Sequence, residues 1–298
     1  MFPFWFEQVK LYLNFYISKI NASVHTRVVS LIIEILIMKL QFYKYHGCGN
    51  DFIMIDNRTA FFPSDDQGLI ASLCSRHFGI GADGLILLEE EDKSFKMLYF
   101  NADGKEGSMC GNGGRCFVAF CKHLQLMDTD ISFNAFDGIH QGIVIEDKHP
   151  TYKISLSLHD TNADSDIFID TGSPHHIEVV ENLPTYNVYS KGKEIRNTYP
   201  KGVNVNFVEK TNDIIQVRTY ERGVEDETLA CGTGVTAVAI SYAIKEEKEG
   251  DNVFYINTKG GELKVSFNKE KNNFSNIKLE ADAVCVYKGE FELLEVII

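Results

Sequence analysis

The chain has 298 residues, of which 44% are hydrophobic and 24% are charged, and its net charge is −13 at pH 7. This length is sufficient for two domains with well-buried cores, and the composition is that of a folded protein rather than a disordered one. The acidic balance disfavours a nucleic-acid partner, which would require clustered lysine and arginine side chains.

The first 37 residues differ in character from the rest of the chain. Their apolar runs, 2–17 and 31–38, are interrupted by charged or amide side chains. Neither run reaches the ~20 apolar residues of a membrane span, and there is no basic start followed by a small-residue cleavage site. We therefore expect residues 1–37 to be an N-terminal extension outside the fold, and we expect no membrane partner.

Short apolar runs separated by Gly, Asn and Asp predict strands in the first half of the chain. These strands are expected at residues 40–45, 52–56, 84–90, 95–101, 131–136, 142–146 and 152–158. One helix is expected between Asp65 and Phe78, and a second from about Gly113 to His123. The polar stretch 159–166 is expected to connect the two halves.

The second half repeats this order of elements. Its strands are expected at residues 176–180, 203–209, 214–220, 253–258, 262–267, 277–280, 283–287 and 291–298, with a helix from about Thr233 to Lys245. We predict an α+β fold of two pseudo-symmetric domains, each a mixed or antiparallel, barrel-like β-sheet wrapped around a central helix. The expected domains are 38–150, joined by a C-terminal strand at 288–298, and 151–287.

Two segments, around Cys110 and Cys231, share the pattern Glu-x-x-x-Cys-Gly-x-Gly followed by an apolar run. In each, the Cys precedes a glycine turn that opens a helix, so nearby backbone N–H groups lack helical partners. Such groups bind anions and stabilise a thiolate, and we expect the pKa of each thiol to fall below its usual value of about 8.5. A single copy would be an ordinary turn, whereas the repeat indicates a functional pair.

Two matched thiols suit a reaction that needs a base on each face of one carbon, namely racemisation or epimerisation. Sulfur atoms flanking a tetrahedral carbon would lie about 7 Å apart, and two thiolates there would repel by ~2.4 kcal/mol at an effective dielectric constant of 20. The pair therefore favours one thiolate and one thiol, which exchange roles at each turnover.

The remaining cysteines and the histidines give no sign of a disulfide framework, a metal site or a nucleotide cofactor. The chain has seven cysteines, an odd number, and no CxxC pair. His175 and His176 are adjacent, and neighbouring residues on a strand point to opposite faces. We therefore expect no cofactor and no metal, and a reducing, cytoplasmic environment.

From Met38 to Ile298 the chain resembles the diaminopimelate epimerase family. The matching motifs, in this order, are KYHGCGNDFIMID, FGIGADG, FNADGKEGSMCGNGGRC, TGSPHH, GVNVNF and YERGVEDETLACGTG. The resemblance implies cofactor-independent conversion of LL-2,6-diaminopimelate to the meso form, a step of lysine and peptidoglycan synthesis. It also implies that the protein binds this small molecule as its substrate and that the protein is a homodimer.

The resemblance assigns roles to residues of this chain. Cys110 and Cys231 would be the two acid–base residues, and Glu221 and His175 would adjust their pKa values and bind the reacting amine. The substrate-binding residues that it implies are Asn50, Asn101, Gly111, Asn112, Asn204, Glu221, Arg222, Gly232 and Thr233. Ser173 and Gly84 depart from the family pattern, in which Asn and Gln are common at these positions. The spacing between Glu221 and Cys231 is also one residue longer than in many members.

Three alternatives remain open at this stage. Proline and hydroxyproline racemases share the two-thiol architecture, but they usually carry His where Asn112 stands and need no Arg for a distal carboxylate. A non-catalytic module that binds an anionic metabolite at the two glycine turns would tolerate Cys→Ser at both positions. Acyl transfer by a Cys nucleophile would need one thiol and one His.

Overall fold

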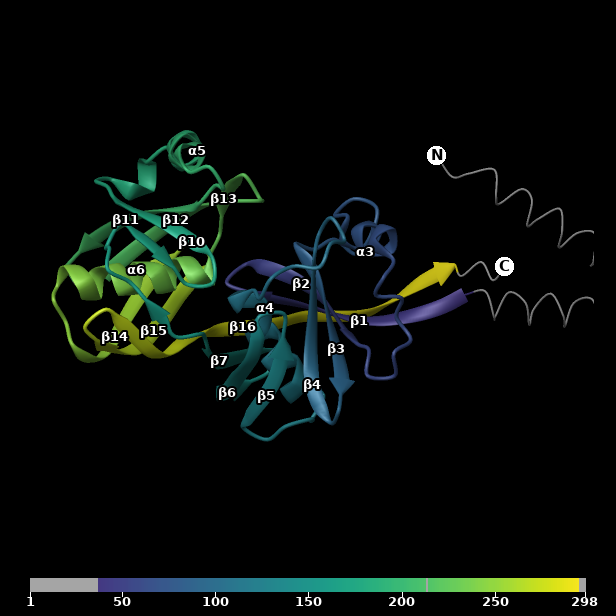
Figure 1. The fold of residues 1–298 in the computed structure, drawn as a ribbon. Coiled ribbons are helices and arrows are strands. Elements are labelled where there is room, and N and C mark those ends of the chain that lie inside the picture. Colours follow the sequence, from purple (N-terminus) through teal and green to yellow (C-terminus); the bar gives the residue numbers. More distant parts are fainter. Residues whose placement is uncertain (1–36, 213, 295–298) are drawn as a thin grey trace, which may run out of the picture. The chain divides into compact units, whose positions relative to one another are not determined.

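The computed structural model describes residues 37–212 and 214–294 (Figure 1). The chain divides into a compact unit, Phe42–Lys288, and a smaller unit formed by the two chain ends. Apart from Ile37, the expected N-terminal extension lies outside the described residues, as do the last four residues of the expected strand 288–298.

In the smaller unit, the described residues are the start of strand β1 (Ile37–Gly47) and the end of strand β16 (Asn273–Leu294). Leu40 is fully buried. Lys39 Nζ lies 3.8 Å from Glu290 Oε2, an exposed ion pair of the kind that contributes little to stability.

The first half of the larger unit is a closed barrel. Its further elements are β2 (Asn50–Asp56), α3 (Gln67–Cys74), β3 (Gly84–Glu91), β4 (Ser94–Asn101), α4 (Gly111–His123), β5 (Asp130–Ala135), β6 (Gly138–Lys148) and β7 (Thr151–Ser157). The pairs β1–β2, β3–β4, β5–β6 and β6–β7 are antiparallel, whereas β2–β3 and β4–β5 are parallel. Because β16 pairs with both β7 and β1, these eight strands close into a ring.

The second half repeats the same series of pairings. Its elements are β8 (Thr161–Asn162), β9 (Phe168–Asp170), β10 (Pro174–Val179), the 3₁₀ turn η1 (Leu183–Thr185), α5 (Val188–Thr198), β11 (Asn204–Thr211), β12 (Ile214–Glu221), β13 (Asp226–Thr228), α6 (Gly232–Lys245), β14 (Gly250–Thr258) and β15 (Gly261–Glu270). The pairs β9–β10, β11–β12, β14–β15 and β15–β16 are antiparallel, and β10–β11 and β12–β14 are parallel.

The order of antiparallel and parallel pairs is therefore identical in the two halves, and α4 and α6 occupy the same place in it. This identity confirms the predicted pseudo-symmetric α+β fold. The domain boundary expected after residue 150 stays a prediction.

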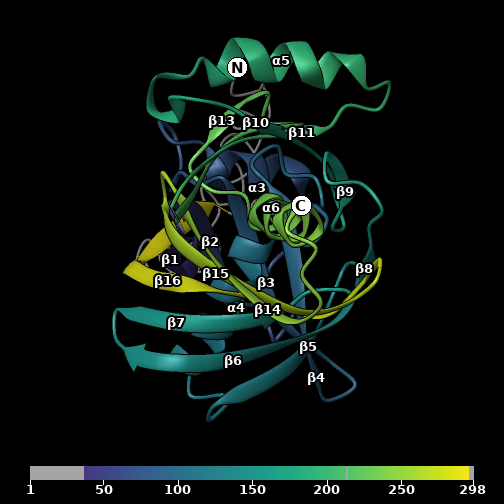
Figure 2. The same ribbon diagram turned by 90° about the vertical axis from the view of Figure 1, so that its left-hand side faces the viewer.

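Each half folds around its central helix. The first eleven residues of α4 are all buried, and α6 is buried over nearly its whole length. Figure 2 shows α6 end on, with strands of the second half arranged around it. A helix buried on all sides needs apolar or small residues all round, as the runs after the two glycine turns provide. None of the described helices is long and apolar enough to cross a membrane.

The expected helices correspond to α3, α4 and α6, whereas α5, β8, β9 and β13 were not predicted. The strands expected at 277–280 and 283–287 are parts of one long strand, β16. Helix α5 has the sequence VYSKGKEIRNT and buries only Val188 and Gly192. It therefore lacks the apolar stripe from which a helix can be recognised. Its start is set locally, since the Asn187 side chain accepts a hydrogen bond from Ser190 N at 3.1 Å.

The N-termini of α4 and α6 meet at Leu279, a fully buried residue of β16. A Cβ atom added to Gly111 would lie 3.1 Å from Leu279 Cδ2. A Cβ atom added to Gly232 would lie 2.9 Å from the same methyl carbon and 3.6 Å from Gly111 Cα. The two helices therefore approach as closely as they do because both positions are glycine.

We expect Leu279→Ala to lower the free energy of unfolding by about 2–5 kcal/mol, as for other large-to-small substitutions in cores. It should also loosen the contact between the helix N-termini, so that Cys110 and Cys231 react faster with iodoacetamide. Urea denaturation and mass-spectrometric alkylation kinetics measure the two effects. Leu263→Ala, also fully buried in the same apolar cluster, is the control. Equal alkylation rates in the two variants would contradict this role of Leu279.

Candidate functional site

In the first half, the predicted site residues gather at one end of three neighbouring strands. Asn50 begins β2, Gly84 begins β3 and Asn101 ends β4, with Gly84 and Asn101 opposite each other in the antiparallel pair. Parallel strands begin at the same edge of a sheet, and an antiparallel neighbour ends there. Cys110 lies at the N-cap of α4, which follows β4 in the chain.

The second half places different residues at the equivalent positions. His175 lies near the start of β10, opposite Asn204 at the start of β11, and Glu221 ends β12. Cys231 is the N-cap residue of α6. The repeat thus brings two thiols and two sets of polar side chains to matching ends of the two halves.

The pKa of the Cys231 thiol depends on its burial and on the charges of neighbouring residues. The pKa of the Cys231 thiol is raised to about 12, chiefly by burial and secondly by the negative charge of Glu221. Ionisation of Cys110 would also raise the Cys231 pKa. Hydrogen bonds from the Thr233 hydroxyl and from Gly234 N–H lower it, but by less.

Cys110 behaves in the same way. Burial raises the pKa of its thiol, and so does the charge of Glu221, whereas the N–H groups of Gly113 and Asn112 lower it. The expectation that the helix N-termini bring both thiol pKa values down is therefore wrong. The N–H groups act in the predicted direction, but the loss of hydration outweighs them.

A chain of hydrogen bonds leads to Cys231 from the core of the second half. Thr219 Oγ1 donates to Asn206 Oδ1 at 3.0 Å, so the Asn206 amide nitrogen faces the other way. That nitrogen donates to the His176 carbonyl at 3.2 Å and lies 3.1 Å from His175 Nδ1. His175 Nδ1 is consequently the acceptor, and the imidazole proton resides on Nε2.

The Nε2–H group of His175 then donates to Thr233 Oγ1 at 3.0 Å. This leaves the Thr233 hydroxyl proton free for Cys231 Sγ, which lies 3.5 Å from Thr233 Oγ1. Burial lowers the pKa of His175 to about 3, with the positive charge of Arg222 as a second cause, so the imidazole is neutral at pH 7. The sulfur of Cys231 is thus offered a hydrogen-bond donor, which favours its thiolate form.

The environment of Cys110 is different. Asn50 Nδ2 donates to Asp83 at 2.8 Å, which turns Asn50 Oδ1 toward the site. That oxygen accepts from Asn112 Nδ2 at 3.2 Å and lies 3.6 Å from Cys110 Sγ. The Asn112 amide also donates to the Ala230 carbonyl at 3.1 Å, a direct contact between the halves. Cys110 is therefore offered an acceptor, which favours its protonated form.

Arg115, which was not predicted, fixes Asn112 from within α4. The Arg115 side chain is fully buried, donates to Asn112 Oδ1 at 2.8 Å and donates to the Gly111 carbonyl at 3.1 Å. Its Nε atom has no hydrogen-bond partner among the described residues. The only signal in the sequence was an arginine next to a glycine-rich turn, a pattern also typical of exposed helix surfaces.

Ser173, Asn204 and Arg222 form one hydrogen-bonded group. Asn204 Nδ2 donates to Ser173 Oγ at 3.0 Å, and Asn204 Oδ1 accepts from Arg222 N at 2.8 Å. The exposed Arg222 guanidinium makes one long contact, 3.4 Å, to the Lys201 carbonyl. Asn204 therefore places the Arg222 backbone, and the guanidinium extends from it.

Tyr99 occupies the space that a side chain at position 84 would need. A Cβ atom added to Gly84 would lie 2.5 Å from the Phe100 carbonyl oxygen and 2.6 Å from Tyr99 Cε2. The Tyr99 hydroxyl donates to Asn101 Oδ1 at 3.0 Å. Burial raises the pKa of Tyr99, and the charges of Cys110 and Glu221 raise it further, which places this hydroxyl close to the site. The sequence predicted only a strand at residues 95–101 and gave no role in the site to Tyr99.

The glutamates of the repeated pattern lie apart from this chemistry. Glu227 pairs with Arg218 through two contacts of 2.6 Å and with Lys259 at 2.8 Å, whereas Glu106 is exposed. The repeat was therefore informative for its Cys-Gly-x-Gly part, and its glutamates have different surroundings in the two halves.

Comparison with known proteins agrees with this arrangement. The family model described as diaminopimelate epimerase matches residues 42–155 and 167–288. Over 258 residues the chain is 46% identical to the diaminopimelate epimerase of Flavobacterium psychrophilum, covering 84% of this chain and 99% of that protein. Identity to the diaminopimelate epimerase of Chlorobaculum tepidum is 41% over 266 residues, covering 83% and 99%.

Solved structures share the fold at much lower identity. A hydroxyproline epimerase from Agrobacterium vitis superposes with a TM-score of 0.65 at 12% identity, covering 86% of this chain and 93% of that one. A phenazine biosynthesis protein of the PhzF family from Bacillus anthracis gives a TM-score of 0.66 at 14% identity, covering 88% and 100%. At such identities the likeness shows the fold alone.

The neutral, buried His175 should make stability depend on pH. Its pKa is about 3 in the folded chain, against about 6.5 when unfolded, so between these values only the unfolded state takes up this proton. Its contribution is complete above pH 6.5 and is lost at ~1.4 kcal/mol per pH unit as the pH falls.

His175→Gln removes this titration. Urea denaturation of both proteins between pH 7 and pH 5 should therefore show that the free energy of unfolding falls less in the variant. This holds whatever the free energy of unfolding of the variant is at pH 7. The comparison cancels the other histidines, which titrate in the same range. Parallel curves for the two proteins would contradict a neutral, buried His175.

Proposed function

The chain belongs to the diaminopimelate epimerase family, and on this premise we propose that it converts LL-2,6-diaminopimelate to the meso form with Cys110 and Cys231 as its two bases. The observation that supports the proposal is the meeting of two helix N-termini at Gly111 and Gly232, each helix being the central one of its half and having a cysteine as its N-cap residue. The charge of a single carboxylate, Glu221, acts on both thiols. The reaction is an isomerisation without an added cofactor.

The proton transfers balance within the thiol pair. With Cys231 as thiolate and Cys110 as thiol, Cys231 removes the α-proton while Cys110 delivers its own proton to the opposite face. Cys231 ends as the thiol and Cys110 as the thiolate, so the reverse reaction starts from this second state. The different hydrogen bonds of the two sulfurs support the first assignment, since Thr233 offers a donor and Asn50 an acceptor.

The raised thiol pKa values give the substrate a part in starting the reaction. A bound α-ammonium group would bring a positive charge beside Glu221 and the sulfurs, and this charge favours ionisation of a thiol. The two helix N-termini would meet the α-carboxylate through backbone N–H groups of Gly111, Gly232 and Thr233. Preorganised donors of this kind stabilise the negative charge that develops when the α-proton leaves.

The distal end of the substrate carries a second carboxylate and a second ammonium group. The Arg222 guanidinium suits the carboxylate, because it presents parallel N–H donors and makes only one long contact among residues 37–212 and 214–294. Asn204 holds the backbone of Arg222 in place. Asn50 and Asn101 would hydrogen-bond to the ammonium or carboxylate group. The Tyr99 hydroxyl holds the Asn101 amide in place.

The main alternative is a racemase acting on proline or hydroxyproline, since a hydroxyproline epimerase and a probable proline racemase are among the structural neighbours. Their likeness extends to the fold and not to the sequence. Asn112 rather than His after the first Cys-Gly, together with Arg222, favours a substrate with two charged ends.

Two further parts of the proposal concern the setting of the enzyme. All seven cysteines are free thiols, which supports a reducing, cytoplasmic environment. A homodimer is expected from the family resemblance. Sedimentation equilibrium of the purified protein tests this expectation, and a monomer at working concentrations would contradict it.

Proton NMR in deuterated water tests the reaction directly. The purified protein, given LL-diaminopimelate and no cofactor, should introduce deuterium at one α-carbon as the meso form accumulates. Cys110→Ser and Cys231→Ser should each lower kcat by about 10²–10⁴-fold, the usual contribution of a positioned acid or base. Cys285→Ala, which removes a buried thiol outside the site, is the control. Unchanged turnover in each of the two single serine variants would contradict the proposal.

A second test addresses the hydroxyl between His175 and Cys231. Thr233→Val removes the donor to the sulfur and should lower kcat by about 10- to 100-fold, the worth of one hydrogen bond to a charged group. Thr233→Ser keeps the hydroxyl and should retain most of kcat.

Asn206→Leu removes the amide that fixes the His175 tautomer. It should lower kcat with KM nearly unchanged, because Asn206 is fully buried behind His175. Thr219→Val, which leaves the Asn206 donors in place, is the matched control and should have a smaller effect. A loss confined to KM would show that these residues serve binding rather than proton transfer.

A further inference from the structure

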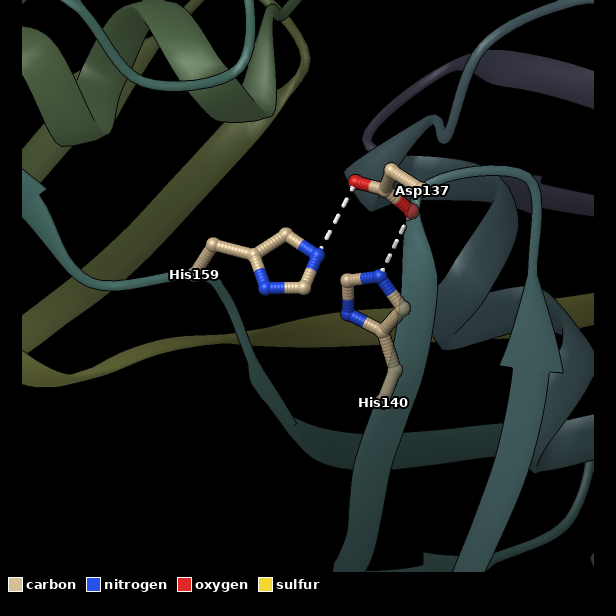
Figure 3. Close-up of side chains that lie close together, drawn as sticks. All are labelled: Asp137, His140 and His159. Atoms are coloured by element: carbon tan, nitrogen blue, oxygen red, sulfur yellow. Dashed lines mark hydrogen bonds and ion pairs between the residues drawn. The ribbon is translucent and has the colours of Figure 1, made fainter.

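Asp137, His140 and His159 lie outside the candidate site and face one another (Figure 3). One ligand-type atom from each residue lies within 4.8 Å of the other two. His140 Nε2 is 2.8 Å from Asp137 Oδ1, and His159 Nε2 is 3.3 Å from Asp137 Oδ2. Two imidazole nitrogens and both oxygens of one carboxylate thus converge on a small volume.

Two separate parts of the chain, the β5–β6 hairpin and the segment after β7, supply these side chains. Asp137 lies in the two-residue loop between β5 and β6, and His140 follows on β6. His159 lies on the segment between β7 and β8. At the start of β6, Gly138 has a φ of +129°, and a Cβ atom there would lie 3.6 Å from His159 Cε1. The hairpin tip therefore packs directly against the His159 ring.

The hydrogen bonds of His140 require a proton or a metal ion at its Nε2 atom. The ring is only 2% exposed, and its Nδ1 atom lies 3.0 Å from the Ser157 carbonyl oxygen, while Nε2 faces the Asp137 carboxylate. Both neighbours are acceptors, and a neutral imidazole has a single N–H group. When Nδ1–H donates to the carbonyl, the Nε2 lone pair faces carboxylate oxygen. A carbonyl on the remote ring nitrogen is also the usual support of a metal-bound histidine.

We propose that Asp137, His140 and His159 bind one divalent transition-metal ion, with Zn²⁺ as the expected occupant. The ligands would be Nε2 of each histidine and the Asp137 carboxylate, with water completing the coordination. Imidazole and carboxylate together suit Zn²⁺, whereas Mg²⁺ and Ca²⁺ prefer oxygen ligands alone. Ligands at ~2.0–2.1 Å from a tetrahedral Zn²⁺ lie about 3.3 Å apart, so the contacts to Asp137 need little adjustment.

The position of His159 gives such a metal a structural role. Leu158, the preceding residue, packs against the apolar clusters of both halves, and its N–H donates to the Ile277 carbonyl at 2.9 Å. A metal ion would tie this crossover segment to the tip of the β5–β6 hairpin. The proposal is independent of the proposed reaction, since none of its ligands belongs to the candidate site.

The test uses the untagged full-length protein carrying Cys110→Ser and Cys231→Ser, because two facing thiols would themselves bind Zn²⁺. Isothermal titration with Zn²⁺ should show one site per chain. Co²⁺ should give the visible absorption of a four- or five-coordinate complex without a thiolate charge-transfer band. Zn²⁺ should also raise the melting temperature, because it binds only the folded chain.

His159→Gln in the same background changes a half-exposed side chain and should weaken Zn²⁺ binding at least tenfold. Asp137→Asn should do the same, and His149→Gln, at an exposed histidine outside the cluster, should bind as the parent does. Absence of Zn²⁺ binding in the parent, or equal binding by His159→Gln, would overturn the proposal. The cluster would then be an imidazole–carboxylate hydrogen-bonded group only.

Discussion

The contact between the N-termini of α4 and α6 is the constraint on which the site depends. Each half buries its own helix, but the two helices can bring their first turns together only because Gly111 and Gly232 present bare Cα atoms to each other and to Leu279. The N-cap residue of each helix is the cysteine. Close packing of two glycines thereby brings together two N-cap residues that are distant in sequence, and burial removes much of the hydration of their thiols.

Exclusion of water has an electrostatic consequence that opposes the helix N-termini. Free N–H groups at both termini favour thiolates, but burial and the shared Glu221 carboxylate favour thiols, and the latter effects prevail. The site therefore holds its two cysteines as thiols, the less basic form, until a positive charge arrives. An amino-acid substrate brings such a charge in its ammonium group, which links ionisation of the base to the presence of the molecule it acts on.

The symmetry of the backbone does not extend to the polar side chains. The main series of strand pairings is the same in both halves, with β12–β13 and β8–β16 as additional pairs in the second, yet Asn112 follows the first Cys-Gly and Thr233 the second. A buried arginine fixes the amide of Asn112, whereas a buried asparagine and a neutral imidazole fix the hydroxyl of Thr233. One sulfur thus faces an acceptor and the other a donor. This difference favours the state in which Cys231 is the thiolate and Cys110 the thiol, which is the starting state for one direction of a two-base reaction.

The sequence was sufficient to predict the repeat, the central helices and a cysteine at the start of each, because these depend on local patterns of glycine and apolar residues. It could not predict contacts that depend on strand register. Asn206 and His175 are in contact because strands β11 and β10 pair in parallel. Asp137 and His159 are in contact because the tip of the β5–β6 hairpin packs against the segment between β7 and β8. Position 84 is a second example of a contact that the sequence did not reveal. Glycine there looked like the loss of a polar contact, but the ring of Tyr99 fills the place and its hydroxyl bonds Asn101. A departure from a family pattern can therefore be interpreted only together with the neighbour that occupies the vacated space.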